Sequence, residues 1–176
     1  MIFAVFIVFL CIQRLTELVI AKNNEKALKA EGAIEYGKSH YPWMVSMHAA
    51  FFISLILEVY LKGFELSKLW PFWLTIFLFA QAGRFWVIKT LGKYWNTKII
   101  VLSDAKVVAA GPYKYIKHPN YAIVATEILV ISLLFNAFFT AVVFSLLNLW
   151  MMSVRIPLEE KALKSHTGYG EVFRGK

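Results

Sequence analysis

Apolar residues in this chain gather into long continuous runs instead of recurring at the spacing of an amphipathic soluble helix. A helix of about 20 mostly apolar residues is long enough to cross the hydrocarbon core of a bilayer. The pattern therefore predicts about five membrane crossings. They are expected near residues 2–20, 43–61, 69–89, 119–135 and 137–154.

The composition supports the same fold class, because 59% of the 176 residues are hydrophobic. A soluble fold of this size needs more polar surface than these runs leave, so an ordinary soluble domain is excluded. We expect one all-α integral membrane domain over residues 1–176. The first run is interpreted as a span and not as a secretory signal, since it lacks a basic flank and a small-residue cleavage site. Cys11 lies inside it, so neither a disulfide framework nor a metal site is expected.

Basic residues predict the orientation. With five crossings, 15 Lys and Arg residues fall in the segments 21–42, 89–118 and 155–176, whereas only Lys62 and Lys68 fall on the opposite side. An excess of this kind is typical of cytoplasmic segments. We therefore expect a multi-pass protein of the cell membrane with its N-terminus outside. The net charge of +8 follows from this topology and from attraction to anionic membrane lipids, so no nucleic-acid partner is expected.

The segments between the runs carry their own predictions. Residues 23–32 have the composition of a short interfacial helix, and a second helix is expected from Pro157 to His166, with the proline in its first turn. The stretches 98–102 and 106–110 flank a turn and predict two extended pieces. Aromatic residues near span ends, Trp95 among them, are typical of the belt that forms at headgroup depth.

Five ionisable residues are predicted to lie at membrane depth. A charged residue there costs at least about 2.5 kcal/mol on insertion scales, so such residues should face the protein interior or water. Two interpretations have equal weight: ion pairs that hold the helices together, or the lining of a pocket open to the cytoplasm. The residues are Arg14, Glu17, His48, Arg84 and Glu127.

Two polar stretches flank the last pair of runs. Pro119 can begin a membrane helix without losing a hydrogen bond, which places His118 and Tyr121 beside the free N–H groups of its first turn. Arg155 and Glu159 are four residues apart and share a helical face. A guanidinium suits a carboxylate or enolate and a carboxylate suits an amine or sulfonium, although such a pair is also typical of a salt bridge.

These stretches are Gly111-Pro112-Tyr113 with Ile116 to Tyr121, and Arg155 with Glu159-Glu160 after two spans. Together they resemble the isoprenylcysteine carboxyl methyltransferase family of integral-membrane methyltransferases. The N-terminal half, with His40-Tyr41-Pro42 and Tyr94 to Ile100, resembles a bacterial branch of alkylpyrone O-methyltransferases.

The resemblance implies S-adenosylmethionine as methyl donor, bound in a cytoplasmic region without a Rossmann fold. It also implies O-methylation of an enol hydroxyl or carboxylate on a lipophilic acceptor, such as an alkylpyrone or an isoprenylcysteine-like lipid. Arg155 would orient the acceptor as the catalytic residue, and Glu159 would hold the amino group of the donor. The remaining cofactor contacts implied are Ala105, Lys106, Val107, Val108, Tyr113, His118, Pro119, Asn120 and Tyr121.

The chain departs from the family pattern at two places. Ala105 stands where the eukaryotic pattern has a histidine, which leaves only a backbone role there. The usual pair of C-terminal tyrosines is replaced by residues 168–173, so no cofactor contact is expected from this tail.

Two other functions remain open at this point. Membrane reductases that use NADPH have a similar His-Pro-Tyr region followed by an acidic helix. A non-enzymatic scaffold or transporter would account for buried charges, although not for polar motifs gathered on one face. The sequence makes no prediction of the oligomeric state.

Overall fold

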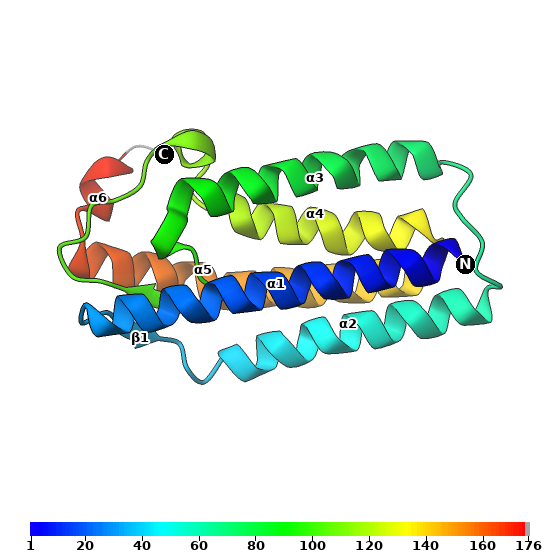
Figure 1. Cartoon of the computed structure of the whole chain (residues 1–176), viewed down its shortest axis with the longest axis horizontal. Helices are drawn as coiled ribbons and strands as arrows, with labels where there is room; N and C mark the ends of the chain where they lie inside the picture. The colour runs from blue at the N-terminus through cyan, green and yellow to red at the C-terminus, as the bar shows by residue number, and fades with distance from the viewer. Residues whose placement is uncertain (175–176) are drawn as a thin grey trace.

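The computed structural model describes residues 1–174, so Lys176, counted above with the basic tail, lies outside the described residues. Long helices run side by side along the long axis of the molecule, and the N-terminus and α6 lie at opposite ends (Figure 1). The helices are α1 (Ile2–Ala30), α2 (Tyr41–Leu61), α3 (Trp70–Leu91), α4 (Pro119–Leu134) and α5 (Phe138–His166).

The all-α membrane architecture is confirmed. Four of these helices, α1, α2, α3 and α5, are long and apolar enough to cross a membrane. The predicted fifth crossing corresponds to α4, an apolar helix of only 16 residues. At 1.5 Å per residue it is about 24 Å long, less than the roughly 30 Å of a hydrocarbon core.

Two helices extend beyond their predicted ends. The separate interfacial helix at residues 23–32 was a wrong prediction, because α1 continues to Ala30 with no breaker before Gly32, whose φ is +93°. The separate tail helix was also wrong, since α5 runs unbroken through Pro157. The proline removes only the hydrogen bond to the carbonyl of Ser153, a residue on the exposed face where water or headgroups can replace it.

A short antiparallel ribbon forms at the end of the bundle opposite the N-terminus. It pairs β1 (Ile34–Tyr36) with β2 (Ile99–Val101), with Ile34 opposite Val101. The predicted strand at 98–102 is thus confirmed, but its expected neighbour at 106–110 forms no strand and the partner comes from before α2. Ile99 and Val101 are buried against Ala162 and Leu158 of α5, which explains this choice of partner.

We call this end of the molecule the polar end. Besides the ribbon it contains the 3₁₀ turns η1 (Gly92–Tyr94) and η2 (Gly111–Lys114) and the short helix α6 (Tyr169–Val172). In Figure 1 these elements gather at the left, around the C-terminal ends of α1, α3 and α5.

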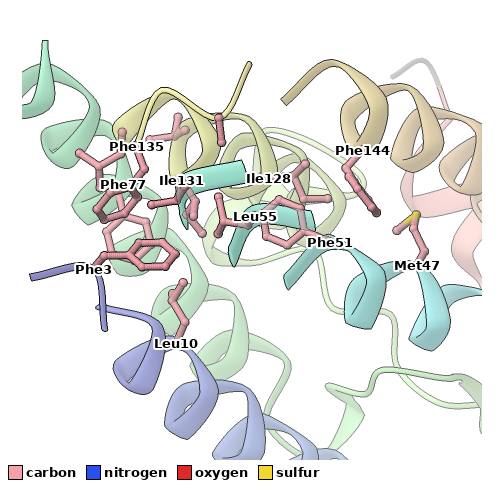
Figure 2. Close-up of a cluster of buried hydrophobic side chains, with 14 of the residues drawn as sticks. Phe3, Leu10, Met47, Phe51, Leu55, Phe77, Ile128, Ile131, Phe135 and Phe144 are labelled. Carbon is pink, nitrogen blue, oxygen red and sulfur yellow. The ribbon is translucent and has the colours of Figure 1, made fainter. Parts of the chain in front are cut away.

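The other half of the bundle is filled by apolar side chains, shown in Figure 2, which we call the apolar cluster. The rings of Phe3 and Phe135 meet edge to face at 4.9 Å, and Phe51 and Phe144 do so at 5.6 Å. Side-chain packing of this kind holds helices together in lipid, where apolar burial from water contributes little. The cluster comprises Phe3, Leu10, Met47, Phe51, Leu55, Val59, Phe77, Ile128, Val130, Ile131, Leu134, Phe135, Ala137, Phe144 and Met151.

A tight connection joins α4 to α5 beside this cluster. Asn136 adopts a left-handed conformation with φ of +56°, and the amide of Ala137 donates to the carbonyl of Ser132 at 2.8 Å. The carboxylate of Glu58 accepts hydrogen bonds from the amides of Phe139 and Thr140 and so caps the start of α5. The resulting hairpin returns the chain to the polar end, as the sequence predicts.

Candidate active site

The polar end contains a cavity of about 450 Å³ that extends into the bundle. Its walls come from all five long helices, from β2 and the segment that follows it, and from α6. The volume falls in the range of roughly 300–1,000 Å³ that small-molecule and cofactor sites occupy. Its deep end reaches Phe52 and Asn148, beside the apolar cluster.

Most of the predicted site residues meet in this cavity. Pro119 and Glu127 are the exceptions, as their side chains do not line it. Pro119 instead begins α4, as predicted, and Glu127 lies behind the wall. Those that line it are Ala105, Lys106, Val107, Val108, Tyr113, His118, Asn120, Tyr121, Arg155 and Glu159 near its mouth, and Arg14, Glu17, His48 and Arg84 deeper in the bundle.

The Gly111 turn brings Tyr113 into the cavity wall. Gly111 has φ of +54°, and a Cβ there would lie 2.6 Å from the Thr90 hydroxyl, so no larger residue fits against α3. The Tyr113 hydroxyl is consequently enclosed. Burial, reinforced by the negative charge of Glu159, raises the pKa of Tyr113 above its ordinary value, so the phenol remains a neutral donor at neutral pH.

Arg155 and Glu159 share the inner face of α5 but do not form the salt bridge that their spacing allows. Arg155 is 5% exposed, and its guanidinium donates to the Thr97 carbonyl at 3.0 Å and to the Tyr121 hydroxyl at 3.4 Å. Within residues 1–174 no carboxylate pairs with it. A buried cation without a counter-charge is costly, and an anion bound beside it would lower that cost.

Glu159 offers the opposite charge at the same level of the cavity. Its Oε2 is buried and has no hydrogen-bond partner in the described part of the chain, and His118 Nδ1 lies 3.8 Å away. His118 itself donates from Nε2 to Glu160 at 3.1 Å. The amide oxygen of Asn120, the indole nitrogen of Trp95 and the hydroxyl of Tyr169 are likewise buried cavity atoms without a partner.

The deeper charges form an ion-pair network, so the structural interpretation is confirmed for four of the five residues. Glu127, 1% exposed, accepts from the guanidinium groups of Arg14 and Arg84. Glu17 accepts from Arg14 at 2.7 Å and from Arg84 at 3.4 Å. Two guanidinium groups thus balance two carboxylates. Arg14, Glu17 and Arg84 also line the cavity, so the two interpretations are not exclusive.

His48 stands apart from that network. Its Nδ1 lies 2.8 Å from the Met44 carbonyl, which can only accept, so this nitrogen carries the proton. Within residues 1–174 its other nitrogen, Nε2, makes no hydrogen bond. The imidazole therefore presents a free nitrogen to the cavity.

Two expectations about aromatic residues were wrong. Trp95 is not a belt residue, because it is 2% exposed and packs against Ala21 and Val87 beside the cavity. The tail after Gly168, from which no contact was expected, lines the cavity through Tyr169 and Phe173. Only the aromatic pair itself, four residues apart in an otherwise polar tail, signals such packing in the sequence.

Among the described residues, no group of three or more His, Cys, Asp or Glu side chains is placed to hold a metal ion. The polar atoms that face the cavity include charged groups of both signs. Arg155 and Glu159 provide those charges.

Comparison with known proteins shows which sequences this chain is similar to. The isoprenylcysteine carboxyl methyltransferase (ICMT) family matches residues 73–165, which include the hairpin and both polar stretches. A Bacillus subtilis protein named uncharacterized protein YpbQ is 46% identical over 94% of this chain and 98% of its own length. An uncharacterized Haemophilus influenzae protein is 35% identical over 89% of this chain and 93% of its own length. No solved structure matches the chain significantly.

Proposed function

Because the chain belongs to the isoprenylcysteine carboxyl methyltransferase family, whose members are methyltransferases that use S-adenosylmethionine, we propose that it methylates an acidic oxygen of a lipophilic acceptor. The acceptor group would be an enol hydroxyl or a carboxylate. An alkylpyrone-type polyketide or an isoprenylcysteine-like lipid has the required chemistry.

One observation carries this proposal. A buried cation without a carboxylate partner, Arg155, and a buried carboxylate oxygen without a hydrogen-bond partner, on Glu159, lie one helical turn apart in the same cavity. The donor contains an amino group and a sulfonium, which a carboxylate attracts, and the acceptor provides the anion that a guanidinium attracts. A scaffold with no ligand would leave both groups unsatisfied.

The unpartnered atoms also fit the donor in number and kind. Glu159 Oε2 and the Asn120 amide oxygen accept hydrogen bonds, and the Tyr169 hydroxyl and Trp95 indole donate them. In this proposal Glu159 holds the amino group, Tyr113, His118, Asn120 and Tyr121 enclose the ligand, and residues 105–108 contact it through their backbone. S-adenosylmethionine supplies an electrophilic methyl group when it is bound.

Arg155 would orient the acceptor. The Thr97 carbonyl and the Tyr121 hydroxyl fix its guanidinium, so little side-chain entropy is lost when an anion binds. The remaining catalytic effect would come from alignment of the two reactants and exclusion of water, for which effective molarities allow about 7–11 kcal/mol at most. The chain's residues thus position the reactants and do not form a covalent intermediate.

An opening between α1 and α2 would fit an acceptor that arrives from the bilayer. Leu18 of α1 and Val45 and Ala49 of α2 line the cavity, and all three residues are exposed. An acyl or isoprenoid tail could remain between these two helices in lipid while the polar head enters the cavity. The soluble donor would then arrive from the polar end.

Ligand titration of the purified protein tests this proposal. S-adenosylmethionine should bind and NADPH should not, and lipid extracts incubated with protein and donor should contain a species heavier by one methyl group. A membrane reductase would bind NADPH instead, and a scaffold would bind neither. Either result would contradict the proposed reaction.

We also propose that the chain is a single domain in the plasma membrane. Its polar end would then face the cytoplasm. Cysteine labelling tests that orientation in a Cys11→Ser background. Asp104→Cys, in the segment after β2, should react only with reagents that reach the cytoplasm. Glu65→Cys, between α2 and α3, should react from outside, and the reverse pattern would invert the topology.

A further inference from the structure

A short loop of the cavity wall fixes the direction of Arg155. We call residues 95–98, which join η1 to β2, the Asn96 loop. Its Thr97 carbonyl accepts the shorter of the two hydrogen bonds that hold the Arg155 guanidinium, at 3.0 Å against 3.4 Å to the Tyr121 hydroxyl. Thr97 lies in a bend, so its carbonyl is not held in place by a helix or a β-ladder. Side-chain contacts must do so instead.

Asn96 supplies the most direct of these contacts. Its Oδ1 accepts a hydrogen bond from the amide of Lys98 at 3.0 Å, and its Nδ2 donates to the carbonyl of Ala21 on α1 at 3.0 Å. The Lys98 amide and the Thr97 carbonyl belong to one planar peptide group. Asn96 therefore holds one side of this group, and Arg155 contacts the other. A continuous series of hydrogen bonds thus links α1 to the guanidinium.

A second asparagine anchors the same loop to α1. Asn24 donates from Nδ2 to the carbonyl of Trp95 at 2.7 Å and to the carbonyl of Gly92 at 3.1 Å. Asn24 and Ala21 are three residues apart, so both anchoring points lie on one face of α1. This face is buried at Ala21, which is 3% exposed. The loop is therefore attached to α1 at two points.

The direction of Arg155 matters because Glu159 lies within its reach. The two residues are four apart on one face of α5, a spacing at which opposite charges commonly pair. The Tyr121 hydroxyl accepts a hydrogen bond from Arg155, and the charge of Glu159 acts on the same hydroxyl. A guanidinium released from the Thr97 carbonyl could therefore turn to the Glu159 carboxylate. Each charge would then satisfy the other, and neither would remain for a ligand.

Resting on the proposed methyl transfer, we infer that Asn96 is a positioning residue, which keeps Arg155 directed to the acceptor and apart from Glu159. It acts through the peptide group of Thr97 and Lys98. Without Asn96 the guanidinium would lose its alignment, and a displacement of about 1 Å in an active site can cost roughly 100-fold in rate. The displaced guanidinium would also occupy Glu159 and compete with the amino group of S-adenosylmethionine.

The main variant is Asn96→Ala, measured with S-adenosylmethionine as donor and with an alkyl-tailed 4-hydroxy-2-pyrone and an S-farnesylcysteine derivative as acceptor probes. Its kcat/KM for the probe that wild type methylates should fall by up to about 100-fold. Its dissociation constant for the donor should rise about tenfold, because a hydrogen bond to a charged group now competes for Glu159. The loss of donor affinity is expected because Arg155 moves, since neither of the two hydrogen bonds of Asn96 reaches Glu159.

A second substitution separates positioning from structure. In an Arg155→Met background there is no guanidinium to displace, so Asn96→Ala should change donor affinity by less than twofold. The double variant should therefore bind the donor more tightly than Asn96→Ala alone. A tenfold loss in both backgrounds would mean that Asn96 only stabilises the loop. Unaltered donor affinity in Asn96→Ala would equally overturn the inference.

Two further asparagine variants complete the test. Asn24→Ala removes the other anchor and should act in the same direction with a smaller effect, so it replaces Asn96→Ala if that variant does not fold. Asn23→Ala, on the exposed face of the same helix, should match wild type throughout.

A readout without ligand keeps the inference separate from the proposed reaction. In ¹⁵N-arginine spectra, the Nε–H signal that Arg155→Met removes should shift in Asn96→Ala. Adding Glu159→Gln should shift this signal further in the Asn96→Ala background than in wild type. No shift in Asn96→Ala would overturn the positioning role. Wild type that binds no S-adenosylmethionine, with both shifts present, would contradict the methyltransferase proposal and leave the positioning of Arg155 standing.

Discussion

The two halves of the bundle are built from the same helices but differ in packing, because one half is filled with apolar side chains and the other surrounds a cavity. Around the apolar cluster, phenylalanine and branched side chains fill the space, and Phe3, Phe51 and Phe135 are almost fully buried. At the polar end the same helices spread around a cavity, and several buried polar atoms find no partner in the described chain. The filled half can hold the helices in register while the hollow half leaves hydrogen-bonding capacity for ligands.

The ion-pair network lies at the boundary between these halves and should have the largest effect on stability. Arg84→Leu leaves Glu127 buried with only Arg14 as a cation, which should cost about 3–5 kcal/mol of unfolding free energy. Unfolding by SDS in mixed micelles measures this change. The double variant Arg84→Leu/Glu127→Leu should recover much of the loss. No recovery would mean that Arg84 contributes packing and not charge.

Within the hollow half, substitution of Glu159 should impair donor binding, and substitution of Arg155 should impair use of the acceptor. Glu159→Gln should weaken S-adenosylmethionine binding by about 1.5–3 kcal/mol, the value of a hydrogen bond to a charged group. Arg155→Met should leave this affinity within threefold and lower kcat/KM for the acceptor instead. Calorimetry and initial rates measure the two effects. Glu171→Gln, an exposed carboxylate on α6, is the control, and unaltered donor affinity in Glu159→Gln would contradict the assignment.

In the filled half a substitution should change stability without changing the chemistry. Phe51→Ala removes a ring that packs against Phe52 and Phe144. We expect a loss of about 1–2 kcal/mol, less than in a soluble core because lipid also solvates the ring. Donor affinity should be unchanged. Phe79→Ala, whose ring is 73% exposed to lipid, should have no effect on either quantity.

The smallest expected effect concerns the ion pairs that hold the ribbon to α1. Lys98 contacts Glu25 at 2.8 Å and Glu35 at 3.5 Å, so Lys98→Met should cost no more than about 1 kcal/mol. Faster amide exchange in β1 measures the local loosening. Lys93→Met, which removes an exposed pair with Glu31, should leave β1 exchange unchanged. Equal amide exchange rates of β1 in both variants would show that the ion pairs of Lys98 do not stabilise the ribbon.

The same pairs predict a dependence on acid. Burial opposes ionisation of Glu35, but the hydrogen bond from Lys29 and the charge of Lys98 outweigh it and hold its pKa below the ordinary value. A depressed carboxyl pKa contributes stability that is present above the ordinary value of 4.5 and is lost as pH falls through the lowered one. Exchange of the β1 amides should therefore accelerate only under acidic conditions.

The parts of the site that could be predicted from the sequence depend on residues that are close together in the chain. Pro119 marks the start of α4, and the spacing of Arg155 and Glu159 places both on one face of α5, because each depends only on near neighbours. Five membrane-depth charges could likewise be expected to gather, since each needs a partner in lipid. Four of the five, all except His48, form the ion-pair network.

Contacts between distant segments were the ones that sequence reasoning missed. The partner of β2 lies more than 60 residues earlier, and only burial of Ile99 and Val101 against α5 selects it. Trp95 has the composition of a belt residue, and nothing near it in the sequence indicates that α1 and α3 enclose it. Tyr169 reaches the cavity only because α5 continues past Pro157, against the usual effect of proline in a helix.

Because α1 and α5 are longer than the hydrocarbon core is thick, the position of the cavity mouth should depend on bilayer thickness. Both α1 and α5 have 29 residues, about 43 Å of helix against roughly 30 Å of hydrocarbon. The surplus lies at the polar end, where α1 carries Lys22, Lys26 and Lys29 and α5 carries Lys161 and Lys164. In thicker lipid the two rods must stand more upright or draw their charged turns toward the acyl chains. How far the mouth of the cavity stands above the headgroups is thus set jointly by the protein and its host membrane.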